Sequence, residues 1–107
     1  MEVKPRQVEH FEDEHGKAPF EDWMEGFEGQ KIHGIIVNRV ERVKQGNFGD
    51  WDSVGDGVFE LIIDFGPGYR VYYGIDQNKV ILLSGGIKKT QTKDIKTAIA
   101  QWGYYNA

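Results

Sequence analysis

The sequence contains no cysteine, which excludes a disulfide-stabilised scaffold and removes thiolates from any zinc site or covalent nucleophile. No apolar run approaches the ~20 residues that are needed to cross a bilayer. The N-terminal stretch MEVKPRQVEHFEDEH is acidic and has no apolar centre, so it is unlike a signal peptide. These absences favour a cytoplasmic protein that does not enter membranes.

Positive charge is also scarce, since 13 Lys and Arg stand against 17 Asp and Glu, with a net charge of -4. This balance argues against a general nucleic-acid binder. The charge is divided unevenly along the chain: residues 1–56 carry 7 basic and 13 acidic residues, whereas residues 57–107 carry 6 basic and 4 acidic residues. We therefore expect an anionic partner to bind the second half.

The length of 107 residues suits one domain, and no repeat or low-complexity linker divides it, so we expect a single domain spanning residues 1–107. The hydrophobic fraction of 39%, with three Trp, five Tyr and six Phe, is too high for a disordered chain.

The spacing of apolar residues predicts helices in the first half and strands in the second. The expected elements are a short edge strand within 2–11, helices at about 19–27 and 28–44, strands at 58–65, 69–75 and 80–84, and a last helix at 91–102. Residues 46–57 are expected to form turns, and Arg39 lies off the apolar stripe of its helix. The order predicts an α+β fold, with an antiparallel meander whose helices cover one face and leave the other open.

The turn signal Gly66-Pro67-Gly68 sets the expected register of the central hairpin. A three-residue loop would pair Asp64 with Arg70 and Ile62 with Tyr72. Because side chains alternate between faces, the open face would then carry Glu60, Asp64, Arg70 and Tyr72. Lys88 and Lys89 follow in the loop before the last helix, where a helix N-terminus favours phosphate.

These groups suit the cleavage of RNA without a metal or cofactor, which needs a base, cations at the phosphate and an acid for the leaving oxygen. Arg70 is suited to a two-pronged phosphate contact, and either Glu60 or a group of the substrate itself would act as the base. Lys88 and Lys89 would add charge, and Tyr72 would stack on a base or donate a proton.

Each residue also has a purely structural interpretation. An Asp64–Arg70 pair across two strands is an ordinary sheet contact, and surface lysines are usually only solvated. Tyr72 and Trp102 are residue types that often pack in a core. The stretch 10–15, which is rich in His and acids, lacks a fixed geometry for a metal ion, so no metal site is expected.

The second half resembles a family of bacterial toxins. The motifs that carry the resemblance are Gly55-Asp56-Gly57-Val58-Phe59-Glu60-Leu61, Asp64-Phe65-Gly66-Pro67-Gly68-Tyr69-Arg70-Val71-Tyr72-Tyr73 and Leu82-Leu83-Ser84-Gly85-Gly86, followed by Lys88, Thr90-Gln91, Asp94-Ile95, Ala98 and Trp102. Over residues 54–102 the chain is similar to the addiction-module killer proteins, the HigB-like and often phage-derived members of the RelE/ParE toxin superfamily.

The resemblance implies a RelE-like fold, with a small antiparallel sheet, an N-terminal helical hairpin and a C-terminal helix. It implies the toxin of a type II toxin–antitoxin system, acting as an mRNA endonuclease on the ribosome and neutralised by a cognate helix-turn-helix antitoxin. Arg70 matches the arginine of the Gly-Tyr-Arg-Val-Tyr motif, and Lys88 matches the lysine after the double glycine. The expected catalytic residues are Arg70, Lys88 and Glu60, and the expected RNA-binding residues are Lys89, Tyr72 and Trp102.

Two positions depart from the pattern, because Ile62 stands where the family has an arginine and Ile87 where it has an acid. A missing cation weakens the case for a nuclease. Two alternatives therefore stay open: a toxin that binds a protein such as DNA gyrase, and an inactive module held by its antitoxin. On the open face Ile62 and Ile87 would form an apolar spot that suits an antitoxin segment.

Overall fold

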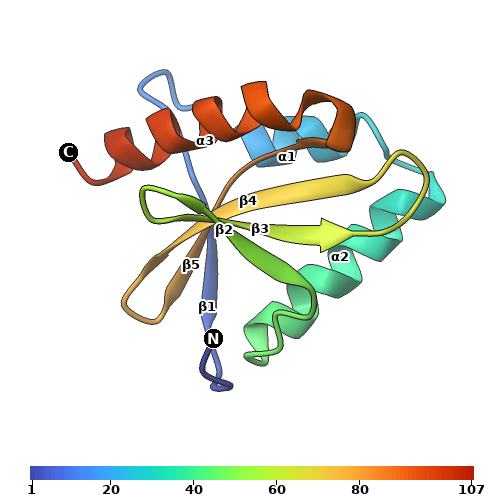
Figure 1. The fold of residues 1–107 in the computed structure, drawn as a ribbon, viewed down its shortest axis with the longest axis horizontal. Coiled ribbons are helices and arrows are strands. Elements are labelled where there is room, and N and C mark those ends of the chain that lie inside the picture. The colour runs from blue at the N-terminus through green and yellow to red at the C-terminus, as the bar shows by residue number, and fades with distance from the viewer.

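The computed structural model describes residues 1–107, in which three α-helices pack on one five-stranded sheet (Figure 1). The elements are β1 (Gln7–His10), α1 (Pro19–Glu25), α2 (Lys31–Lys44), β2 (Trp51–Gly55), β3 (Val58–Ile63), β4 (Tyr69–Asp76), β5 (Lys79–Ile87), one 3-10 turn η1 (Lys88–Thr90) and α3 (Gln91–Tyr105). The strand order is β1-β5-β4-β3-β2, with β1 parallel to β5 and the other neighbours antiparallel. The prediction of an α+β fold is confirmed.

The two N-terminal helices begin where local chemistry favours a start. Pro19 is the first residue of α1, where its missing N–H is not needed, and Phe20 and Met24 turn one buried face to the sheet. Helix α2 begins at Lys31 instead of near residue 28, because Gly29 has a φ of +81°, which a right-handed helix cannot contain.

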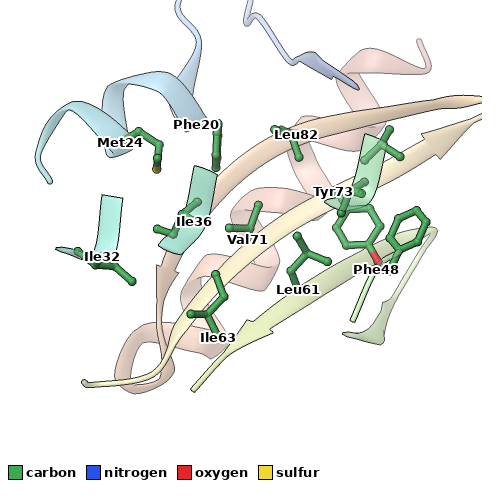
Figure 2. Packing of buried hydrophobic residues seen from close by; sticks show 12 residues of the cluster. Phe20, Met24, Ile32, Ile36, Phe48, Leu61, Ile63, Val71, Tyr73 and Leu82 are labelled. Carbon is green, nitrogen blue, oxygen red and sulfur yellow. The ribbon is translucent and has the colours of Figure 1, made fainter. Parts of the chain in front are cut away.

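The larger core lies between the sheet and the helices α1 and α2. Figure 2 shows Phe20 and Met24 beside Ile36, packed toward Val71 and Leu82 of the central strands. The buried members are Phe20, Met24, Ile32, Ile36, Val43, Phe48, Leu61, Ile63, Val71, Tyr73, Val80 and Leu82. Each Å² of apolar surface that this layer buries stabilises the fold by ~25 cal/mol.

The opposite face is not open, which corrects the prediction that helices cover only one side. Helix α3 contacts β3, β4 and β5 and runs along the upper side of the molecule in Figure 1. It closes a second core made of Phe11, Val58, Tyr72, Ile81, Leu83 and Ala98. The physical reason is that the apolar stripe of α3 requires an apolar surface, and the strands present one on that face.

Two strands differ from the prediction. β2 occupies residues that were expected to form turns, because its five residues carry a bulge between Ser53 and Gly55 that breaks the alternating pattern. Trp51 of this edge strand packs on Phe59, with ring centroids 5.8 Å apart. β1 is an edge strand as expected, but its parallel pairing with β5 makes the sheet mixed, so the prediction of a purely antiparallel sheet was wrong.

The register of the β3–β4 hairpin is shifted by two residues from the prediction. The loop spans residues 64–68, and the observed pairs are Ile63 with Tyr69, Ile62 with Arg70 and Glu60 with Tyr72. Asp64 lies exposed in this loop, so it does not pair with Arg70. Because a shift of two preserves the faces, Glu60, Arg70 and Tyr72 still share one face of the sheet.

Arg39 of α2 is a structural residue that the sequence pattern placed off the apolar stripe. It is only 8% exposed and donates to the carbonyl oxygens of Ile62 (2.7 Å), Phe48 (3.0 Å) and Asp50 (2.9 Å). Burial lowers the pKa of its guanidinium, with the nearby Arg42 as a second cause. These three bonds join α2 to the β2–β3 part of the sheet.

Candidate functional site

A cluster of polar side chains lies buried between the sheet and the first turns of α3. We call Glu60, Arg70, Tyr72, Ser84 and Gln91 the polar cluster; they come from β3, β4, β5 and α3. Glu60 and Arg70 are 4% and 9% exposed, with 3.7 Å between Glu60 Oε1 and Arg70 Nε. The amide Nε2 of Gln91 donates to both carboxylate oxygens of Glu60, at 2.9 and 3.1 Å. The carboxylate is therefore held from the strand side and from the helix side.

Three buried polar atoms of the cluster have no protein hydrogen-bond partner. They are Arg70 Nε, Tyr72 Oη and Ser84 Oγ. Burying such a group without a hydrogen-bond partner costs about 1–3 kcal/mol. Burial raises the pKa of the Tyr72 phenol, and the negative charges of Glu60 and Asp94 raise it further. Tyr72 therefore stays protonated at neutral pH and can only donate or accept a hydrogen bond.

The guanidinium of Arg70 and the side chain of Lys88 both lie close to Gly68. Nη1 donates to the carbonyl oxygen of Tyr69 at 3.2 Å, and a Cβ added to Gly68 would lie 3.5 Å from Nη1 and 3.4 Å from Lys88 Cβ. The backbone N–H of Lys88 donates to the carbonyl oxygen of Gly68 at 2.8 Å. The structure thus brings Arg70, Glu60 and Lys88 into one region.

Four lysines form an exposed basic face at the start of α3, which we call the lysine face: Lys88, Lys89, Lys93 and Lys96. None of them makes an ion pair. The last three, with Thr90 and Thr92, line a depression of about 470 Å³. Sequence reasoning missed Lys93 and Lys96, although the spacing of 89, 93 and 96 places them on one helix face. It also missed the hydrogen bonds that Gln91 donates to Glu60, because no sequence pattern indicates this pairing.

Tyr72 and Trp102 both pack between α3 and the sheet, Tyr72 fully buried and Trp102 half-buried. Tyr72 is fully buried beneath α3. Trp102 is eleven residues from Gln91, about 16 Å along the helix, and stacks on Tyr105 with ring centroids 5.1 Å apart. A Cβ on Gly74 would approach the Trp102 ring to 2.5 Å, so this indole packs α3 onto β4.

Ile62 and Ile87 do not form one apolar spot, which corrects the expectation for an antitoxin contact. Ile62 is in register with Arg70, whereas Ile87 is in register with Tyr69. Consecutive residues of a strand point to opposite faces, and the Tyr69 ring packs on Trp23 of α1. The two isoleucines therefore lie on opposite faces of the sheet.

A hydrogen bond between Tyr105 and Asp76 holds the C-terminal end of α3 to β4, and its contribution to stability should depend on pH. Tyr105 Oη donates to Asp76 Oδ2 at 2.8 Å, and this bond raises the pKa of Tyr105 to about 12. A tyrosine of the unfolded chain ionises near pH ~10, so the bond contributes its full stability below that pH and loses it as the pH rises toward 12.

We expect the difference in unfolding free energy between wild type and Tyr105→Phe to shrink as the pH rises from 9 to 12. Below pH ~10 the difference should be at most about 1 kcal/mol, because the bond is partly exposed. Urea unfolding followed by tryptophan fluorescence at each pH measures it. A difference that stays constant over this range would contradict the assignment.

The chain is similar in sequence to a bacterial protein. It is 51% identical over 81 residues to a protein of Haemophilus influenzae strain Rd that is described as uncharacterized, and the alignment covers 74% of this chain and 81% of the relative. No family model and no solved structure matches the sequence. No helix has both the length and the hydropathy that a membrane span requires.

Proposed function

We propose that this chain, which belongs to the same protein family as the Haemophilus influenzae protein, is an RNA-cleaving toxin of a type II toxin–antitoxin system with a RelE-like fold. The single observation that carries the proposal is the placing of Arg70 beside Lys88 at Gly68, next to the unpaired lysine face. The element order, with α1 and α2 before the antiparallel strands β2–β5 and α3 after them, supports the fold assignment.

The lysine face would bind the RNA backbone through its phosphates, and its lack of competing carboxylate partners supports this role. Arg70 would stabilise the charge that develops on the scissile phosphate, with Lys88 as the second cation. No metal or cofactor is required in this scheme.

The surroundings of Glu60 favour a revised role for this residue. Both of its carboxylate oxygens accept bonds from Gln91, and Arg70 lies against one of them. A carboxylate engaged in this way would orient Arg70 instead of taking a proton. A non-bridging oxygen of the scissile phosphate would then accept the proton of the 2′-hydroxyl as the 2′-oxygen attacks phosphorus, and this proton would pass to the 5′-oxygen as its bond to phosphorus breaks. The proposed partners remain mRNA on the ribosome and a cognate helix-turn-helix antitoxin, in the cytoplasm.

The test compares two double variants that remove the same charge. Lys88→Ala with Lys89→Ala removes two cations of the lysine face, whereas Lys4→Ala with Lys17→Ala removes two exposed cations of the N-terminal segment. All four side chains are exposed, so both variants should fold as the wild type does. Loss of electrostatic stabilisers lowers such rates by ~10²–10³-fold, so we expect growth arrest only from wild type and the control. Growth after induction and mapped transcript ends are the measurements.

The outcomes separate the alternatives. Arrest with new transcript ends, both lost only in the Lys88/Lys89 variant, supports the nuclease and its site. Arrest with intact transcripts would favour a protein target such as DNA gyrase, which suits a chain with net charge -4 and with Ile62 in place of a cation. No arrest from folded wild type would favour the inactive module.

A further inference from the structure

Helices α1 and α2 leave a groove of about 410 Å³ on the outer surface, on the side of the sheet away from the lysine face. Its apolar floor consists of Phe20, Met24, Val37 and Val40. Val37 is 38% exposed and is one of only three large hydrophobic residues exposed in the whole structure. With His33, Val40 and Lys44 it follows a helical spacing of 33, 37, 40 and 44, so α2 turns a second face toward the groove.

The rim of the groove is acidic. Glu21 and Glu25 line it from α1, Glu28 lines it from the turn that follows this helix, and Glu41 lines it from α2. Glu21 and Glu25 lie four residues apart on one helix face, where like charges repel one another. His10 contacts Glu21 and Lys44 lies 3.0 Å from Glu41, but Glu25 and Glu28 make no ion pair. The chain thus keeps uncompensated negative charge beside exposed apolar surface.

We propose that this groove binds an amphipathic helix of a partner protein, with an apolar stripe that enters the groove and Lys or Arg on both sides of the stripe. A groove between two helices is the surface on which a third helix seats its residues at i, i+3, i+4 and i+7. The two unpaired rim carboxylates, Glu25 and Glu28, select basic flanks by charge complementarity and repel nucleic acid. The inference does not depend on the proposed RNA cleavage, since no residue of that site lines the groove.

The probe is a designed helical peptide of about 18 residues, long enough to follow the groove over several turns. It carries Leu at i, i+3, i+4 and i+7 with Lys on both flanks. One control peptide has Glu in place of Lys, and another has the same composition in a scrambled order that destroys the stripe. Fluorescence anisotropy with the full-length protein gives the affinity of each peptide.

Two charge-matched double variants locate the binding. Glu25→Lys with Glu28→Lys reverses the unpaired rim charges, and Glu12→Lys with Glu14→Lys makes the same change in the loop before α1. Val37→Gln tests the floor at an exposed position. Circular dichroism confirms that each variant is folded.

We expect the basic amphipathic peptide to bind and the two controls to fail. The affinity should fall about tenfold or more in the Glu25/Glu28 variant, fall in Val37→Gln, and stay within about twofold of wild type in the Glu12/Glu14 variant. Equal binding of the scrambled peptide, or an equal loss in both double variants, would mean attraction by net charge only and would overturn the proposal. Sedimentation that shows the protein self-associating, with the groove variant monomeric, would assign the groove to a second copy instead.

Discussion

Arg39→Ala is expected to lower the free energy of unfolding by about 3 kcal/mol or more, which is a large part of the ~5–15 kcal/mol typical of a domain. The guanidinium is buried and donates to three carbonyl oxygens, of Ile62, Phe48 and Asp50. Alanine leaves these acceptors with one bond fewer and opens a void beside Gly49, whose own backbone lies against the guanidinium. Urea unfolding at neutral pH measures the loss.

The matched control is Arg42→Ala on the same helix. Arg42 is exposed, so its removal should change the unfolding free energy by no more than about 0.5 kcal/mol. Arg39→Lys should fall between the two, because one ammonium cannot reproduce the forked contacts of a guanidinium. Equal stability of the two alanine variants would show that the three bonds contribute nothing net.

The sequence contained enough to predict which face each central residue occupies. The alternation in β3 and β4 has a period of two, so Glu60, Arg70 and Tyr72 stayed together although the loop was two residues longer than expected. The last helix begins at Gln91 as predicted, and its apolar stripe is real. Local patterns of this kind depend on neighbouring residues, which a single sequence displays directly.

What the sequence could not show are contacts between distant segments. The parallel pairing of β1 with β5 joins residues more than seventy positions apart, and no local pattern encodes it. The packing of α3 over Tyr72 likewise depends on contacts between distant segments. Because of it, the predicted open face is instead a buried polar cluster with the lysine face at its edge. Arg39 was missed because charge was given more weight than its spacing: 32, 36, 39 and 43 form one buried helix face.

Arg70→Met is expected to destabilise the protein by about 3–5 kcal/mol, because it leaves a buried carboxylate without its charged partner. Without the guanidinium, the carboxylate of Glu60 remains 4% exposed with Gln91 as its only protein partner. A loss of growth arrest in any single Arg70 variant would therefore confuse unfolding with lost chemistry.

A double variant separates the two effects. Replacing a buried ion pair by apolar residues of similar volume is often neutral or stabilising by about 1–4 kcal/mol, so Glu60→Leu with Arg70→Met should recover most of the stability that either single change loses. Urea unfolding of wild type, both single variants and the double variant gives the coupling energy of the pair. A double variant as unstable as the sum of the singles would show that Glu60 and Arg70 are not coupled as the 3.7 Å contact indicates.

The same double variant then tests what the charge is for. If it is stable and folded but no longer arrests growth, the guanidinium beside Lys88 serves the reaction and is retained at a cost to stability. If it arrests growth as wild type does, the Glu60–Arg70 pair is purely structural, and the proposed chemistry would have to rest on the lysine face alone.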